Sequence, residues 1–281
     1  GVHGNFRSSY KNRHMITRRQ AISTLAIGSA AAILPAGCAT NDSREADGQV
    51  NKSSSTRFMF ALNTSTISGH NPEIQDYIGI AARAGYDYVE IWVRDLQAYV
   101  DAGNSPASLK KITSDHGIRI ASAIGFAPWM TGGPAGFEQM EREMEMLAEA
   151  GCPRIAAPPA GVDPAIPLDF FAVGERYAAL LELGRRTGVM PQLEFWGASP
   201  VLWHMGQVLM VAAAANDPDV KILPDVYHMF RGGSGFDSLK MLDGNLIDLF
   251  HMNDYPAVKP RLEQVDADRV YPGDGAAPLQ Q

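Results

Sequence analysis

Three side chains that could hold a metal ion stand at regular intervals in the second half of this sequence. Glu194 ends the apolar run MPQLE, Asp225 ends ILPD, and His251 ends IDLFH. The intervals of 31 and 26 residues are close to the roughly 30 residues that one strand and one helix occupy in a (β/α)8 barrel. The spacing therefore predicts three metal ligands at three successive strand ends, on the face of the barrel where active sites form.

Side-chain parity supports a shared pocket, because residues two apart on a strand lie on the same face. Asp225 shares the parity of Leu223, and His251 that of Asn253. Two carboxylates and an imidazole suit one divalent ion, either Mn²⁺, Mg²⁺, Co²⁺ or Zn²⁺, and spacing does not choose among these metals. Taken singly, each residue has another interpretation. Glu194 could cap a helix, Asp225 could pair with an arginine, and His251 could be a hydrogen-bonded core histidine.

These residues, with the Asp225-x-x-His228 pair and the run DRVYPGDG that contains Arg269, resemble the sugar phosphate isomerase/epimerase family of xylose isomerase-like TIM barrels. The resemblance covers the chain after its first 56 residues. It implies that Glu194, Asp225 and His251 hold one divalent metal ion. It also implies a fourth ligand, a glutamate on strand eight, which has no counterpart before the sequence ends.

The resemblance implies a reaction as well, namely proton transfer next to a carbonyl through an enediolate that a metal stabilises. Glu194 would be both ligand and base. His228 would hydrogen-bond the carbonyl oxygen, and Arg269 would hold a substrate oxygen near the developing charge. We therefore expect an isomerase or epimerase of a small ketose or cyclic polyol. Without the strand-eight glutamate, the chain as written should bind metal but epimerise poorly.

Other strand ends carry candidates for substrate contact. Glu90 ends an apolar strand with its side chain turned inward, where it would contact substrate or join a buried hydrogen-bond network. Trp92, Trp129 and Trp196 also lie at expected strand ends, where aromatic faces can stack on a sugar ring. Packing in the core is the alternative for each tryptophan. The sequence shows no basic cluster for a phosphate group, which favours a non-phosphorylated substrate.

Strand and helix patterns alternate from residue 57 onward, which indicates a parallel sheet covered by helices. A helix from residue 106 follows the second strand. Seven strands can be counted, so we predict an α/β fold, a (β/α)8 TIM barrel over residues 57–281 that is truncated before strand eight. A barrel open on one side is the alternative. The strands are expected at 57–66, 86–93, 118–126, 154–160, 190–197, 220–228 and 247–254.

The first 56 residues are expected to lie outside the barrel. Residues 1–14 are interpreted as extraneous upstream sequence. Residues 15–38 contain two adjacent arginines before an apolar run that is too short to span a bilayer, the pattern of a twin-arginine export signal. They end in PAGC, which resembles a lipoprotein cleavage box and predicts lipidation of Cys38. Residues 39–56 are polar and predict a flexible tether. We therefore expect a periplasmic protein whose only membrane contact is a lipid anchor.

The net charge argues for a small carbohydrate as partner rather than nucleic acid. It is −7 overall, and the first 37 residues hold five basic and no acidic residues, which leaves −12 for the remainder. Such a surface repels phosphate backbones. Two other functions stay open. One is an exported carbohydrate-binding lipoprotein with a degenerate site. The other is an endonuclease IV-like metal hydrolase, although the first four strand ends lack the histidines that it needs. The sequence leaves the oligomeric state open.

Overall fold

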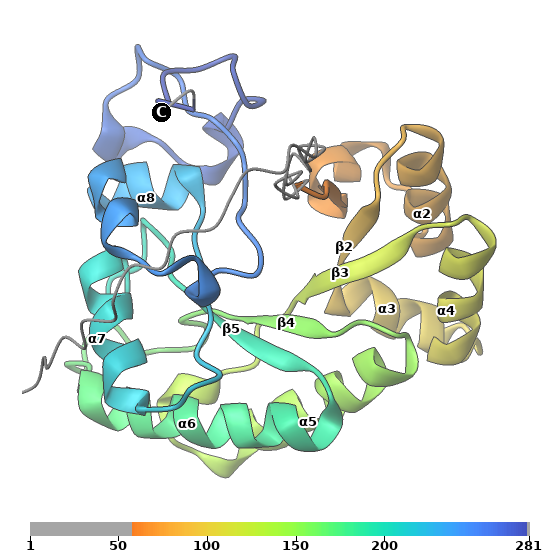
Figure 1. Ribbon diagram of the computed structural model, residues 1–281, viewed down its shortest axis with the longest axis horizontal. Coiled ribbons are helices and arrows are strands. Elements are labelled where there is room, and N and C mark those ends of the chain that lie inside the picture. Colours follow the sequence, from red (N-terminus) through yellow and green to blue (C-terminus); the bar gives the residue numbers. More distant parts are fainter. Residues whose placement is uncertain (1–57, 280–281) are drawn as a thin grey trace, which may run out of the picture. The chain divides into compact units, whose positions relative to one another are not determined.

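The computed structural model of the protein describes residues 58–279 (Figure 1). The expected export signal, the lipidated Cys38 and the polar tether lie outside these residues. In this part of the chain, none of the helices combines the length and the apolar character needed to cross a membrane.

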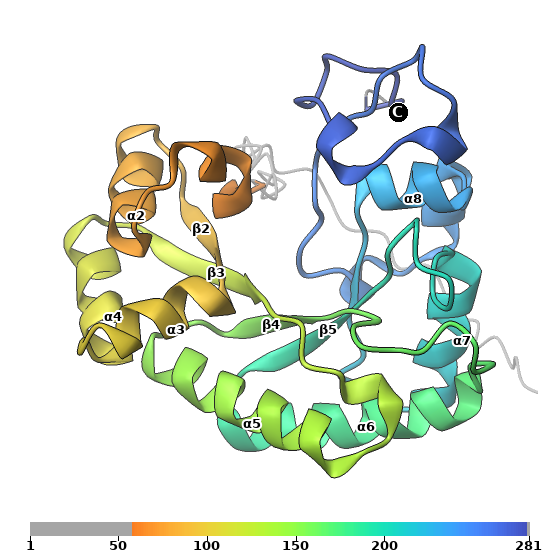
Figure 2. The ribbon, with the colours of Figure 1, turned by 180° about the vertical axis from the view of Figure 1, so that it is seen from behind.

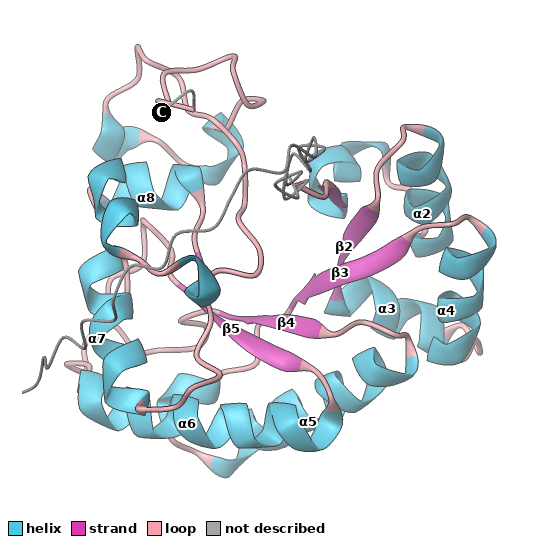
Figure 3. Cartoon of the chain, viewed as in Figure 1, coloured by secondary structure: helices cyan, strands magenta, loops and turns pink. Residues whose placement is uncertain are grey.

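Six parallel strands form one sheet in which neighbours in space are also neighbours in sequence (Figure 3). In the register of the sheet, Asn63 lies opposite Glu90, and Glu194 lies opposite Leu223, so that β5 and β6 end level. Within residues 58–279 the sheet does not close on itself, so the fold is an incomplete TIM barrel, as the strand pattern predicts. The strands are β1 (Ala61–Asn63), β2 (Tyr88–Trp92), β3 (Arg119–Ile124), β4 (Arg154–Ala157), β5 (Met190–Glu194) and β6 (Ile222–Leu223).

Helices connect the strands and cover the outer face of the sheet (Figures 1 and 2). One of them, α3, was not expected, because it begins directly after β2 and nine residues give too few turns for a clear periodic pattern. The α-helices are α2 (Ile74–Arg83), α3 (Val93–Asp101), α4 (Pro106–Asp115), α5 (Pro134–Glu149), α6 (Phe170–Thr187), α7 (Met205–Ala215) and α8 (Val226–Gly232). Short 3-10 helices are η1 (Thr64–His70), η2 (Trp129–Thr131), η3 (Phe236–Met241), η4 (Gly244–Leu246), η5 (Arg261–Glu263) and η6 (Asp266–Asp268).

The outer helices α6 and α7 pack closely against each other at Gly174. A Cβ atom built on Gly174 would lie 2.5 Å from the Ala214 Cβ, far below contact distance. The same helix carries Tyr177, which is fully buried and whose hydroxyl lies 3.0 Å from Pro191 O and 2.8 Å from Lys221 O. Helix α6 is thus fixed both to its neighbour and to the strands β5 and β6 beneath it.

A Gly174→Ala variant tests this packing. Helix propensity alone predicts a gain of about 1 kcal/mol, but overpacking in a well-packed core costs about 1–3 kcal/mol. We expect a net loss of stability in urea unfolding. The control is Gly244→Ala, whose added carbon meets nothing within 4 Å and which should change stability by less than about 0.5 kcal/mol. A more stable Gly174→Ala variant would mean that α6 and α7 lie further apart.

The predicted strand at 220–228 is wrong beyond Leu223, where helix α8 soon begins. Pro224 has no N–H group to offer a sheet partner. The Asp225 side chain then accepts a hydrogen bond from the backbone N–H of His228 at 2.9 Å, which caps the new helix. The motif Asp-x-x-His is therefore a helix start, with Asp225 at the cap and His228 in the first turn.

The predicted strand at 247–254 is also wrong as a regular strand, because it makes one parallel bridge, between Asp225 and His251. The His251 N–H donates to Pro224 O at 2.9 Å, and the Val226 N–H donates to His251 O at 3.2 Å. The partner strand ends at this point and turns into α8, so no extended backbone is left to continue the ladder. The bridge nevertheless places His251 beside Asp225, at the end of β6.

A loop that follows this segment is anchored on one buried carboxylate. Asp254 has no exposed surface and forms an antiparallel bridge with Val270. Burial opposes ionisation of this carboxylate, but its backbone donors outweigh burial and lower the pKa of Asp254. The loop that it holds begins directly after Arg269. The donors are the backbone N–H groups of Tyr255, Gly273, Gly275 and Ala277, at 2.8 to 3.1 Å.

An Asp254→Ala variant should release this loop, because it leaves four N–H groups without their acceptor. We expect a local loss of about 2 kcal/mol, seen as amide exchange of Gly273 and Gly275 that is faster by roughly 30-fold. The lowered pKa sets the pH dependence. The stabilisation is complete above about pH 4, the value for an unfolded aspartate, and is lost as the pH falls through the lower folded value. Unchanged exchange in the variant would contradict this role.

Candidate active site

A cluster of buried polar side chains lies at the carboxyl ends of the strands, the face where TIM barrels carry their active sites. Glu90 lies in the middle of β2, Glu194 ends β5 and Asp225 follows β6; their exposed fractions are 2%, 4% and 1%. His251 joins them through its bridge to Asp225. Three carboxylates thus lie in one buried region, where positive charge must compensate them.

His251 supplies part of this positive charge. Its Nε2 lies 2.8 Å from Glu90 Oε2, and its Nδ1 lies 3.6 Å from Asp225 Oδ2. Burial disfavours the charged ring, but the two carboxylates outweigh burial and raise the pKa of His251 well above its ordinary value. The raised pKa favours the protonated form of the His251 ring, which lies between two acidic side chains.

Asp225 is held by several donors at once. Its Oδ2 accepts from Arg269 Nη1 at 2.7 Å and from Asn253 Nδ2 at 3.0 Å, while Oδ1 caps α8 through His228 N. Burial works against ionisation, but the neighbouring cations Arg269 and His251 lower the pKa of Asp225 well below its ordinary value. Asp225 therefore stays ionised, and it does pair with an arginine, one of the alternatives that the sequence allowed.

Glu194 differs from Asp225, because its Oε2 is buried and has no hydrogen-bond partner among the described residues. Burial raises the pKa of Glu194 to about 7, although the His251 charge works in the opposite direction. A carboxyl group with a pKa near neutral can both take up and release a proton at physiological pH, as a general base must.

His228 and Arg269 present hydrogen-bond donors side by side. The Gly197 N–H donates to His228 Nδ1 at 3.2 Å, and His228 Nε2 lies 3.1 Å from Arg269 Nη2. Burial lowers the pKa of His228 to about 4, so the ring is neutral and only one of its nitrogens accepts. Arg269 Nη2 can only donate, so its contact with Nε2 is a hydrogen bond only if Nε2 accepts, whereas the Gly197 N–H requires Nδ1 to accept. In the tautomer that accepts from Gly197, the Nε2 proton and the Arg269 guanidinium can donate together to one ligand oxygen.

Aromatic rings form a continuous surface at the ends of β2, β3 and β5. The Phe126 ring centroid lies 5.3 Å from that of Trp92 and 5.8 Å from that of Trp196. Phe126 is 43% exposed, and the Arg94 guanidinium lies 4.2 Å from the Trp92 ring centroid. The structure thus brings Trp92 and Trp196 together, and their faces are of the kind that stacks on a sugar ring.

The chain is also similar to known proteins. Residues 78–281 match the family model described as the xylose isomerase-like TIM barrel. The chain belongs to this family.

Two relatives with sequence similarity to this chain are inosose isomerases. That of Bacillus velezensis is 24% identical over 216 residues, which is 74% of this chain and 77% of the relative. That of Bacillus subtilis is 32% identical over 101 residues, 36% of each chain.

Solved structures confirm the xylose isomerase-like fold. The crystal structure of the IolI protein with a bound zinc atom aligns with a TM-score of 0.71 at 22% identity, over 79% of this chain and 82% of that one. The 3-keto-D-glucoside 4-epimerase of E. coli aligns with a TM-score of 0.54 at 20% identity, over 71% of this chain and 85% of that one.

The residue types at this site, two carboxylates and an imidazole, are of the kind that binds a divalent ion. Glu194 has a buried oxygen without a partner, and Asp225 and His251 lie side by side. In the described range, however, no three side chains of His, Cys, Asp or Glu are arranged around one ion position. The Asp225 oxygen that faces His251 is occupied by the Arg269 guanidinium. A shared metal site therefore stays a prediction.

The structure corrects one predicted substrate contact, Trp129. This side chain is 0% exposed. Its Nε1 donates to Pro158 O at 3.0 Å, and its ring lies 5.8 Å from the Tyr177 ring. Trp129 belongs to the core under α6, the alternative that packing offered, because the chain after β3 turns outward into η2 rather than toward the site.

Two asparagines of the site were missed from the sequence. Asn63, at the end of β1, donates from Nδ2 to Glu90 Oε2 at 2.8 Å. Asn253 donates to Asp225 and accepts from the Tyr227 N–H at 2.8 Å. The available signal was their position, since each lies at an expected strand end and Asn253 shares the parity of His251.

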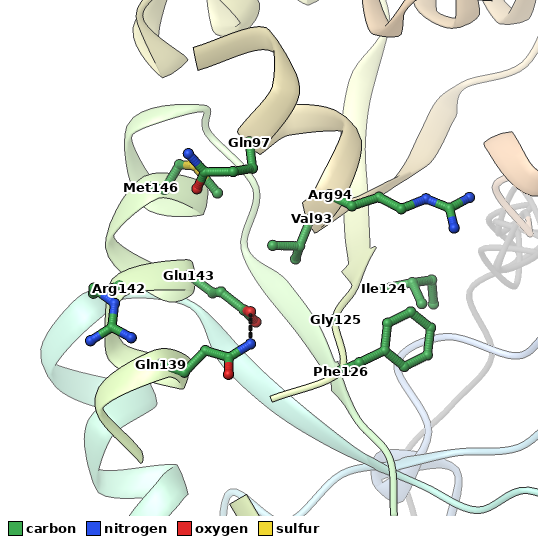
Figure 4. A pocket seen from close by; sticks show the side chains of 10 residues that line it. All are labelled: Val93, Arg94, Gln97, Ile124, Gly125, Phe126, Gln139, Arg142, Glu143 and Met146. Carbon is green, nitrogen blue, oxygen red and sulfur yellow. Dashed lines mark hydrogen bonds between the residues drawn. The ribbon is translucent and has the colours of Figure 1, made fainter. Parts of the chain in front are cut away.

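A separate cavity of ≈ 400 Å³ opens between α3 and α5 beside the end of β3 (Figure 4). Its wall includes Phe126, and it contains Glu143, which accepts a hydrogen bond from Gln139 Nε2 at 2.8 Å. Because its lining includes none of the buried side chains around His251, we place the candidate active site at the strand ends rather than in this cavity.

Proposed function

We propose that this protein is a metal-dependent isomerase or epimerase of a small ketose or cyclic polyol, acting by proton transfer next to a carbonyl. The observation that supports this proposal most directly is Glu194, a buried carboxyl group with a pKa of about 7 and an oxygen without a hydrogen-bond partner among the described residues. The similarity to inosose isomerases and to a 3-keto-D-glucoside 4-epimerase supports a sugar isomerase or epimerase. The zinc atom of the IolI protein supports a divalent metal.

We propose the following roles for the residues of the site. Glu194, Asp225 and His251 would hold the metal, which when bound supplies Lewis acidity beside the substrate carbonyl. Glu194 would remove the proton from the adjacent carbon. His228 Nε2 and the Arg269 guanidinium would donate to the carbonyl oxygen as negative charge develops on it.

The substrate ring would lie against the aromatic surface of Trp92, Phe126 and Trp196. Phe126 presents an exposed face there, and aromatic faces bury the apolar side of a sugar while leaving its hydroxyl groups free for hydrogen bonds. The acidic surface and the absence of a basic cluster favour an uncharged substrate over a phosphorylated one.

Two measurements on the wild-type protein test this function. We expect about one equivalent of Mn, Mg, Co or Zn in elemental analysis of the purified chain. We also expect deuterium from solvent at the carbon next to the carbonyl of a ketose or an inosose. Bound metal with deuterium exchange but no net product would indicate that the protein removes and returns the proton without completing the isomerisation. Sugar binding without any exchange would instead favour a carbohydrate-binding protein, which the aromatic surface would also suit.

We further propose that the protein is exported and anchored through Cys38. The support is the sequence alone, with two adjacent arginines, an apolar run and PAGC. Expression in a bacterium with labelled palmitate should label the wild-type protein and not a Cys38→Ala variant. Replacement of both arginines, Arg18 and Arg19, by lysine should retain the protein in the cytoplasm. Equal labelling of wild type and variant would exclude the anchor.

A further inference from the structure

We propose that Tyr227 is a positioning residue for Arg269, whose guanidinium it holds beside His228. This inference rests on the proposed function, in which Arg269 and His228 donate to the carbonyl oxygen of the substrate. The contact that carries it does not depend on a bound metal. It joins a buried aromatic ring to a guanidinium group, since the Arg269 Cζ lies over the Tyr227 ring at 4.6 Å from the ring centroid.

The Tyr227 ring is fixed by its place in the first turn of α8. The residue is 1% exposed and belongs to a buried cluster with Val226 and Tyr255. Its backbone N–H is one of the donors that the start of a helix leaves without a partner inside the helix. Asn253 Oδ1 accepts from this N–H at 2.8 Å, and Asn253 Nδ2 donates to Asp225 Oδ2 at 3.0 Å. The same amide thus ties the Tyr227 backbone to the Asp225 carboxylate.

The polar contacts of Arg269 do not fix its orientation by themselves. Nη1 donates to the buried Asp225 Oδ2 at 2.7 Å, and a single hydrogen bond leaves the guanidinium free to turn about it. Nη2 donates to Asp266 Oδ1 at 3.2 Å, but the Asp266 side chain is 77% exposed, and pairs with exposed groups contribute little. The Tyr227 ring supplies a second fixed contact, on the face of the guanidinium, while Nη2 lies 3.1 Å from His228 Nε2.

The role needs the face of the ring and not its hydroxyl group. A cation over an aromatic face is held more strongly where water is excluded, and the Arg269 side chain is only 26% exposed. The Tyr227 Oη, in contrast, is buried and has no hydrogen-bond partner among the described residues. Phenylalanine should therefore replace Tyr227 in this role, whereas an aliphatic side chain should not.

The first test reads the orientation of Arg269 from ring-current shifts in NMR spectra. Protons over an aromatic face resonate at lower frequency, so the Arg269 side-chain signals should be shifted in the wild type and in Tyr227→Phe, and not in Tyr227→Leu. The matched control is Tyr88→Leu, because Arg119 lies over the Tyr88 ring at the same 4.6 Å. This control should move the Arg119 signals and leave those of Arg269 in place. Unchanged Arg119 signals in Tyr227→Leu would show that this variant is folded.

The second test measures deuterium uptake next to the carbonyl of a ketose or an inosose. Loss of a largely buried cation–π contact corresponds to roughly 5- to 30-fold. We expect this fall in the rate at saturating substrate for Tyr227→Leu, because Arg269 acts on charge that develops in the transition state. Tyr227→Phe and Tyr88→Leu should keep the wild-type rate. Wild-type uptake in Tyr227→Leu, or unshifted Arg269 signals in the wild type, would overturn the inference and leave the proposed function intact. A wild type without any uptake would instead refute the proposed function, and this role with it.

Discussion

A Glu194→Gln variant should lose proton exchange and yet fold at least as stably as the wild type. Removal of a general base typically lowers the rate by about 10²- to 10⁴-fold, and the amide also removes one of the three proposed metal ligands. The effect on stability has the opposite sign. The pKa of Glu194 is raised to about 7, so the folded protein favours the protonated carboxyl group. As the pH rises above the pKa of an unfolded glutamate, ionisation of Glu194 therefore lowers the stability of the fold.

The measurement compares deuterium exchange with urea unfolding at pH 5 and pH 8. The neutral amide should bring a gain in stability that is larger at pH 8, because there the wild-type carboxylate is ionised without a hydrogen-bond partner on Oε2. Glu143→Gln is the control for the loss of exchange. Burial also raises the pKa of Glu143, but this residue lies outside the proposed site. Retained exchange in Glu194→Gln would exclude Glu194 as the base.

An Asp225→Asn variant should be strongly destabilised and should bind no metal. Asparagine caps a helix about as well as aspartate, so α8 keeps its start. The charge is lost, however, which leaves the Arg269 guanidinium and the His251 imidazolium without their shared counter-ion. Removal of one partner from a buried ion pair costs about 3–5 kcal/mol.

Urea unfolding at several pH values checks this expectation. The lowered pKa of Asp225 means that its stabilisation is complete above about pH 4, the ordinary aspartate value, and is lost as the pH falls through the folded value. The gap between wild type and Asp225→Asn should therefore be full at pH 7 and close in strong acid. Equal stabilities at pH 7 would show that Asp225 and Arg269 are not paired in solution.

Most of the fold could be predicted from the sequence, because buried parallel strands are continuous apolar runs that helices separate. The pattern failed where one residue changed the backbone. Pro224 ended β6 early, and the Asp225 cap started a helix inside a predicted strand. Helix α3 was missed because Val93 continues the apolar pattern of β2 without a break, and only tertiary contacts decide where such a strand stops.

The site was predictable in its residue types more than in its contacts. Apolar runs that end in Glu194, Asp225 and His251 predicted three neighbouring strand ends. The structure has Glu194 at the end of β5 and Asp225 at the start of α8, and it brings His251 to Asp225 through a single bridge. Sequence patterns cannot tell a ring in the core from a ring in a pocket, so Trp129 was misplaced. They also give amides no distinct signal, so Asn63 was overlooked although its contacts organise the Glu90 carboxylate.

The way in which Asp254 gathers four backbone amides has a use in protein engineering. The loop after Arg269 is anchored by its main chain and one carboxylate, so its outward side chains, among them the exposed Tyr271, can be randomised without touching the anchor. Gly273, with a φ of 94°, and Gly275, where a Cβ would lie 2.4 Å from Asp254 Oδ1, must stay glycine. A combinatorial library built on this loop could therefore alter ligand preference near Arg269 while preserving the scaffold.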